Sequence, residues 1–105
     1  MRILFLWPSS ILVICGLVGC VAAPPPYEEF TLARAAVRAA QDVDSARYAT
    51  GLWHKADEAF RHGSKSFREN EFGEAKRYFE IAIEYAERAE NATRLKKFQS
   101  GDTFP

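Results

Sequence analysis

Apolar residues recur every three or four positions from residue 30 to residue 89, and this spacing restricts the chain to amphipathic helices. Three sets share the spacing: Phe30, Ala33, Val37 and Ala40; Trp53, Ala56, Phe60, Gly63 and Phe67; and Phe72, Ala75, Phe79, Ala82, Ala86 and Ala89. Each set gives one apolar stripe along a helix. The pattern predicts an all-α fold of three amphipathic antiparallel helices.

Turn-forming residues mark where these helices end. The first helix is predicted over residues 28–47, the second over 51–69 and the third over 71–98. Thr50 is expected to cap the second helix, and Asn70 is expected to form the next turn and cap the third helix. The second and third helices therefore form an αα-hairpin.

Gly63 lies in the middle of the second helix, on its apolar stripe. Glycine in a helix interior costs about 1 kcal/mol relative to alanine. Its placement on the stripe is typical of a position where a neighbouring helix approaches closely. Phe79, in the third helix, is expected to meet Phe60 or Phe67 across the hairpin.

The first twenty residues carry the parts of a secretory signal. Arg2 supplies a positive charge, and two apolar runs, residues 3–7 and 11–17, precede Val18, Gly19 and Cys20. The segment ending in Leu17, Val18, Gly19 and Cys20 resembles the lipobox of bacterial lipoprotein signals. The resemblance implies that the Cys20 thiol receives a diacylglyceryl group and that a peptidase cuts between Gly19 and Cys20.

Lipidation would decide where the protein is located. Each buried methylene contributes about 0.8 kcal/mol, so two acyl chains anchor a protein stably. By the same resemblance, a third chain such as palmitate is added to the new amino group of Cys20. Val21 stands where an aspartate retains lipoproteins in the inner membrane of enteric bacteria. We therefore expect a lipid anchor on the periplasmic face of the bacterial cell envelope, at the outer membrane.

Two alternatives to lipidation remain open for this N-terminal segment. Residues 3–23 are about long enough for an uncleaved membrane helix, which needs roughly 20 apolar residues. The break at Pro8 disfavours that helix. A soluble secreted protein would leave Cys20 as a free thiol.

Processing would divide the chain into four parts. Residues 1–19 form the signal peptide, 20–26 the lipidated cysteine and proline-rich tether, 27–98 the helical domain and 99–105 a disordered tail. The 105 residues include 14 basic and 14 acidic side chains, so no net field attracts nucleic acid. Cys15 would leave with the signal and Cys20 would be acylated, so no disulfide is expected. A small core held by helix packing alone favours self-association.

A Tyr-Ala pair ends the first alanine-rich helix, in the segment Ala46, Arg47, Tyr48 and Ala49, and the apolar repeats follow it. With these features, residues 33–92 resemble an uncharacterised domain family of alanine-rich bacterial envelope lipoproteins, the domain of unknown function DUF4398. That family often has proline where this chain has Thr50. The resemblance implies an envelope compartment and a helical fold, and it implies no reaction because the family has no established activity.

The second and third helices also resemble a single tetratricopeptide-type hairpin. The matching small and bulky positions are Ala59, Gly63, Phe72, Ala75, Phe79 and Ala82. A peptide-binding groove of that kind normally needs several stacked repeats, and no second copy is found. The resemblance therefore implies the hairpin without its usual peptide binding.

Two histidines give the only pattern that suits a metal. His54, Glu58 and His62 lie four residues apart on the second helix, with Asp57 adjacent, and this spacing could chelate a divalent cation. They lie away from the apolar stripe, and no other helix obviously supports them. We interpret them as an exposed charged face and expect no cofactor and no resident metal.

The remaining polar residues do not converge on a catalytic arrangement. The processed chain has no free cysteine, its serines stand in no nucleophile motif, and no glycine-rich phosphate loop is present. Glu80, Glu84 and Glu87 form an acidic ridge and Arg34 and Arg38 a basic one, which we interpret as solvated faces. We interpret the aromatic residues as core and not as a ligand-binding box.

The sequence therefore favours a non-enzymatic structural or protein-interaction module, with an envelope protein or a second copy as partner and no small-molecule substrate. An accessory subunit that contacts peptidoglycan or an envelope assembly machine is the first alternative. Periplasmic metal binding is the second.

Overall fold

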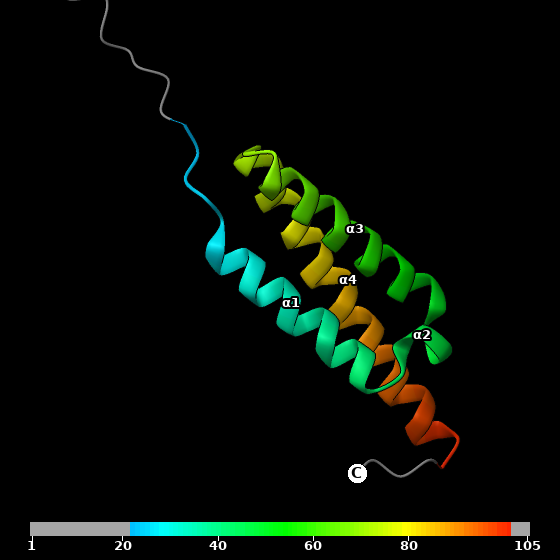
Figure 1. Cartoon of the computed structure of the whole chain (residues 1–105). Helices are drawn as coiled ribbons and strands as arrows, with labels where there is room; N and C mark the ends of the chain where they lie inside the picture. The colour runs from blue at the N-terminus through cyan, green and yellow to red at the C-terminus, as the bar shows by residue number, and fades with distance from the viewer. Residues whose placement is uncertain (1–21, 102–105) are drawn as a thin grey trace, which may run out of the picture.

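The computed structural model describes residues 22–101, which form four helices and no strand (Figure 1). The helices are α1 (Tyr27–Asp42), α2 (Ser45–Tyr48), α3 (Thr50–Arg68) and α4 (Phe72–Gln99). The three long helices run down, up and down, so the predicted all-α class and antiparallel order are confirmed. The first helix begins at Tyr27 and the last ends at Gln99.

The first predicted helix is wrong in one respect, because it is broken at Val43 and Asp44. Asp44 has φ 67° and ψ 40°, the left-handed conformation that aspartate tolerates better than most residues. The last turn of α1 contains no basic residue to favour the negative end of the helix. The short helix α2 then redirects the chain and places Ser45 in the interior, fully buried.

Ser45 and Thr93 form a buried polar pair that joins α2 to α4. The Ser45 Oγ and Thr93 Oγ1 atoms are 2.8 Å apart. Thr93 Oγ1 donates its single proton to the Ala89 carbonyl at 2.7 Å, so the Ser45 hydroxyl donates to Thr93. This hydrogen bond joins residues 48 positions apart and holds the start of α2 against α4.

The turn between α3 and α4 is held by the backbone. Asn70 has φ 61°, the Asn70 N–H donates to Phe67 and the Glu71 N–H donates to Ser66. These bonds form a Schellman motif, in which asparagine is a good substitute for glycine. Asn70 therefore forms the predicted turn.

Neither predicted side-chain cap is present. Glu71 precedes α4 and Ala49 precedes α3, and neither cap residue makes a side-chain hydrogen bond to its helix. Thr50 lies inside α3, where its Oγ1 donates to the Ala46 carbonyl at 2.9 Å. The hydroxyl of Thr50 therefore bonds the preceding α2 turn, and the cap prediction was wrong.

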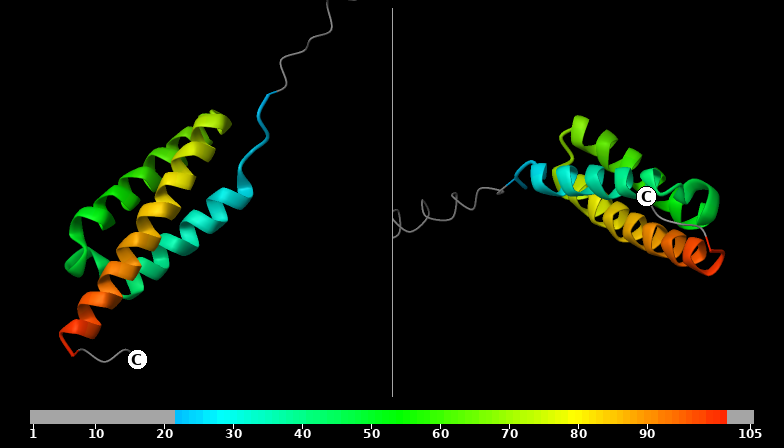
Figure 2. Two further views of the ribbon diagram at one scale, coloured as in Figure 1. Left: turned by 180° about the vertical axis from the view of Figure 1, so that it is seen from behind. Right: turned by 90° about the horizontal axis from the view of Figure 1, so that it is seen from below.

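Helix α4 lies against both α1 and α3, so it forms the middle of the bundle (Figure 2). Alanines make most of this contact. The buried alanines of α4 are Ala75, Ala82, Ala86 and Ala89, and those of the facing helices are Ala33, Ala40, Ala56 and Ala59. Their small side chains let the three helices approach closely, which confirms the predicted apolar stripe of α4.

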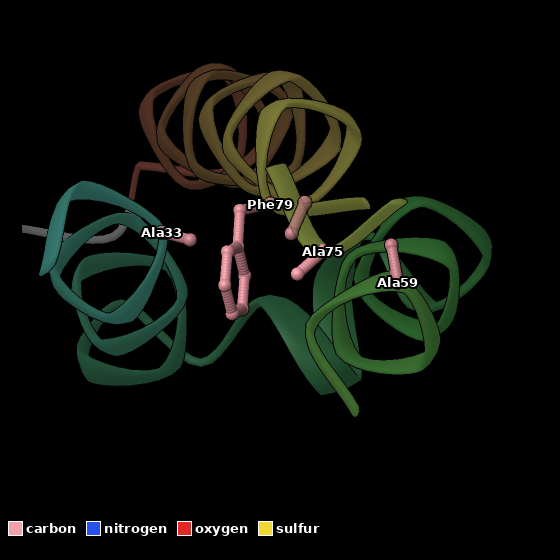
Figure 3. Packing of buried hydrophobic residues seen from close by; sticks show 5 residues of the cluster. Ala33, Ala59, Ala75 and Phe79 are labelled. Atoms are coloured by element: carbon pink, nitrogen blue, oxygen red, sulfur yellow. The ribbon is translucent and has the colours of Figure 1, made fainter. Parts of the chain in front are cut away.

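Phe79 is the one large apolar side chain that is completely buried among residues 22–101. Its ring points from α4 into the space between α1 and α3 (Figure 3). The ring centroid lies 5.5 Å from that of Phe30, 5.9 Å from Phe60 and 6.4 Å from Phe67. The predicted contacts across the hairpin are therefore confirmed, and Phe30 of α1 joins them.

Two ion pairs at i and i+4 lie on α4. Arg94 contacts Glu90 at 2.8 Å, and Arg88 lies 3.9 Å from Glu84. One ion pair joins two helices, because Lys76 of α4 lies 3.5 Å from Glu29 in the first turn of α1. Exposed pairs of this kind contribute little, so the packed alanines and the ring of Phe79 carry most of the stability.

Candidate interaction surface

The predicted lipidation and cleavage sites, Cys20 and Gly19, lie outside the described residues. Residues 22–26 precede α1 (Figure 1), and Ala22 and Ala23 border a hollow that residues 70–74 of the α3–α4 turn also line. Within residues 22–101, no helix combines the length and the apolar character that crossing a bilayer requires.

The three candidate metal ligands, His54, Glu58 and His62, are exposed on α3. The His62 Nε2 atom lies 3.8 Å from Glu58 Oε1, and the imidazole stacks on Tyr78 with ring centroids 5.3 Å apart. No cluster of three or more histidine, cysteine or acidic side chains suited to a metal is present in the described part of the chain. These three side chains line part of a charged, open hollow of about 650 Å³, which Arg61 also lines.

The two predicted charged ridges are both exposed, on different helices. Glu80, Glu84 and Glu87 lie on α4, and Arg34 and Arg38 lie on α1. The structure therefore places them on solvated faces, as expected. Arg34 has a second environment, because it also borders an apolar groove.

This groove lies between α1 and α3 and has a volume of about 490 Å³. Its walls are formed by Tyr27, Phe30, Arg34, Phe60, Ser64, Phe67 and Arg68. All seven residues belong to α1 or α3, and every one of them is half-buried or exposed. The groove is therefore a shallow surface channel, which we call the aromatic groove.

Ring contacts hold the walls of the aromatic groove in place. Phe30 of α1 stacks on Phe60 with ring centroids 6.0 Å apart, and Tyr27 contacts Phe67 edge to face with ring centroids 5.5 Å apart. Phe79 lies behind these rings, because it contacts Phe30, Phe60 and Phe67 from α4. The exposed apolar surface is thus backed by a fully buried side chain.

The rim of the aromatic groove is positively charged. Arg34 borders it on α1 and Arg68 on α3, and neither guanidinium forms an ion pair within residues 22–101. Asp57 lies two turns before Ser64 on the same side of α3, but Arg61 holds its carboxylate at 3.0 Å. An apolar floor with two unpaired guanidinium groups suits a ligand that is both apolar and acidic.

The sequence did not predict this groove. The buried residues of α3 are Ala56, Ala59, Gly63 and Ser66, and the large residues Trp53, Phe60 and Phe67 lie beside them, half-buried. Large and small residues therefore occupy different sides of the apolar stripe. Of the aromatic residues that we interpreted as core, the structure buries Phe79 completely and leaves Trp53, Phe60, Phe67 and Phe72 partly exposed.

At the opposite end of the bundle, the end of α2 contacts the last turns of α4. Lys96 of α4 donates a hydrogen bond to the Tyr48 carbonyl, and the Lys97 ammonium lies 5.2 Å from the Tyr48 ring centroid. Leu95 and Phe98 project outward nearby with exposed fractions of 57% and 76%. These contacts tie the end of α2 to the last turns of α4.

One carboxyl group at the α3–α4 turn has a displaced pKa. A hydrogen bond between the side chains of Glu71 and Glu74, together with their repulsion, raises the pKa of Glu71 above its ordinary value. Partial desolvation and Glu69 add to the shift, and Lys65 opposes it. Glu71 is not one of the residues that line the aromatic groove.

Comparison with known proteins gives one match. A family profile described as a domain of unknown function, DUF4398, matches residues 28–101. Neither the curated proteins nor the solved structures contain a match. Because the profile spans all four helices and well over half of the sequence, the chain belongs to the DUF4398 family.

Proposed function

We propose that this protein is a lipid-anchored, non-enzymatic interaction module of the bacterial cell envelope. The lipobox ending in Cys20 supports the anchor, and residues 22–26 supply a short proline-rich connection to α1. The observation that carries the proposal is the aromatic groove, which begins at Tyr27, one residue after this connection. A binding surface so close to the anchor would act near the membrane, at the periplasmic face of the outer membrane.

The two cysteines of the chain provide a matched test of the anchor. Cys20→Ser should abolish incorporation of an alkyne-labelled fatty acid, accumulate the unprocessed precursor and prevent cleavage after Gly19. Cys15→Ser removes a thiol from the signal without touching the lipobox, so labelling and processing should persist. Cleavage after Gly19 and membrane retention of the Cys20→Ser protein would refute the anchor.

The interaction role needs a separate measurement. Crosslinking of the lipidated protein in its own envelope, followed by purification, should recover a specific protein partner. Recovery of peptidoglycan fragments alone would favour the accessory role at the cell wall. Recovery of neither, from an envelope in which lipidation is verified, would remove the support for an interaction module.

A further inference from the structure

The aromatic groove lies where a fourth long helix could pack against α1 and α3. Helices α1 and α3 both pack on α4 (Figure 3), and the groove is lined by residues of α1 and α3 and by none of α4. A helix laid there would complete a four-helix arrangement with α1, α3 and α4. We propose that the aromatic groove binds an acidic amphipathic helix of a partner protein, which deepens and rests on the proposed interaction function.

The dimensions of the groove define the length of that helix. Along α1 the lining extends from Tyr27 to Arg34, which is about 10 Å at 1.5 Å per residue. Two helical turns therefore cover the groove, and apolar residues at i, i+3, i+4 and i+7 would contact Phe30, Phe60 and Phe67. Ser64, between the two phenylalanines of α3, leaves room for one of these side chains.

The charge of the rim defines the chemistry of the helix. Arg34 and Arg68 stand on opposite walls and have no ion-pair partner within residues 22–101. Acidic residues flanking the apolar stripe of a partner helix would meet these guanidinium groups. The partner is therefore apolar on one face and acidic along both edges of that face.

The same features disfavour two other occupants. A second copy docked about a two-fold axis would bring the arginines of both rims together, because such an interface uses the same patch twice. A fatty acyl chain needs a site that encloses most of its surface. The aromatic groove contains no fully buried lining residue and is open along its length.

Site-specific photocrosslinking identifies the occupant in the intact envelope. A photoreactive residue replaces Ser64 in the groove of the lipidated protein, and a second variant carries it at Tyr27, an exposed residue on the α1 wall of the groove. A control variant carries it at Glu80, which is exposed on α4. The groove variants should crosslink to a protein segment that has an apolar stripe flanked by acidic residues, and the control should not.

A charge reversal tests whether the rim arginines select this segment. The double variant Arg34→Glu with Arg68→Glu should lower the crosslinking yield about tenfold, because attraction becomes repulsion at two sites. The control double variant Arg77→Glu with Arg88→Glu changes the net charge equally on α4 and should leave the yield unchanged. Replacing the acidic residues of the captured segment by lysine should restore crosslinking to the groove double variant.

Several outcomes would overturn the proposal. They are crosslinks to a second copy of this chain, to lipid, or to a segment without acidic flanks, and an equal loss of yield in both double variants. The absence of any groove crosslink would overturn it as well. The fatty-acid labelling of Cys20 is measured on the same samples, so loss of the anchor is distinguished from an empty groove.

Discussion

A Cβ atom added to Gly63 of α3 would lie 2.7 Å from Cδ1 and 2.8 Å from Cε1 of the Phe79 ring of α4. The close approach predicted from a glycine on the apolar stripe is therefore an approach of glycine to an aromatic ring. The ring has no free space to retreat into, because it is fully buried and contacts Phe30 and Phe60 on its other sides. Gly63 is the residue that lets α3 and α4 pack around a phenylalanine.

This contact predicts that two glycine-to-alanine substitutions change the free energy of unfolding in opposite directions. Gly63→Ala should destabilise the protein, because overpacking costs about 1–3 kcal/mol and exceeds the gain of up to about 1 kcal/mol in helix propensity. Gly73→Ala, in the first turn of α4, has nothing within 4 Å of its new Cβ and should stabilise slightly. Thermal unfolding should show a lower Tm for the first variant and an unchanged or higher Tm for the second. A higher Tm for Gly63→Ala would mean that the ring moves freely.

Removing the ring should be more damaging than crowding it. Phe79→Ala costs about 3–5 kcal/mol, which is a large part of the 5–15 kcal/mol typical of a whole domain. We expect the cooperative thermal transition to be largely lost. Phe72→Ala, at a half-buried ring that contacts Phe67 edge to face at 5.6 Å, is the matched control and should keep a clear transition. A shift of only a degree or two for Phe79→Ala would contradict the burial of this ring.

Helical spacing correctly predicted which residues of α4 face the core, because a 3.6-residue period alone decides the face. It did not predict the break at Asp44 or the Ser45–Thr93 hydrogen bond that follows the break, because this bond joins residues 48 positions apart. A local pattern contains no information about such a partner.

The aromatic groove escaped prediction for a related reason. Helical spacing predicts the apolar stripe of α3 as one face, but in the structure the stripe divides into a small-residue side that packs on α4 and an aromatic side that faces α1. Trp53, Phe60 and Phe67 are seven residues apart and therefore share one edge of the stripe. Ala56 and Gly63 repeat with the same spacing on the neighbouring edge of the stripe. This division into an aromatic edge and a small-residue edge is the pattern that indicates a groove.

The Ser45–Thr93 pair predicts a strong coupling between two substitutions. Thr93→Val should cost about 1–3 kcal/mol, because the buried Ser45 hydroxyl loses its acceptor. Ser45→Ala alone should cost less, since Thr93 keeps its bond to Ala89. The double variant should be less destabilised than the sum of the two single variants, as measured by urea unfolding in a double-mutant cycle. Simple additivity would show that the pair does not act as a unit.

The raised pKa of Glu71 predicts a stability effect with a definite pH dependence. The folded state binds this proton more tightly than the unfolded state, so the ionised carboxylate is the less favourable form in the fold. Stability should therefore fall slightly as the pH rises through the pKa of Glu71. Glu71→Gln should be more stable than the wild type at pH 7, and the difference should shrink at a pH below the ordinary glutamate range. Glu87→Gln, on the exposed ridge of α4, removes the same charge from another part of the surface and is the control.

The exposed histidines predict that added metal has no effect on stability. His54 and His62 project into solvent from one helix, without the supporting hydrogen bonds that tight sites need. A metal that bound the native state would stabilise it by about 2.7 kcal/mol at a hundredfold excess over its dissociation constant. Micromolar zinc or copper should therefore leave the Tm unchanged. The Tm of the His54→Gln, His62→Gln double variant should likewise not change when metal is added. The double variant itself should be slightly less stable, because the His62 ring stacks on Tyr78 at 5.3 Å. A saturable rise in Tm with metal that disappears in the double variant would instead establish a metal site on α3.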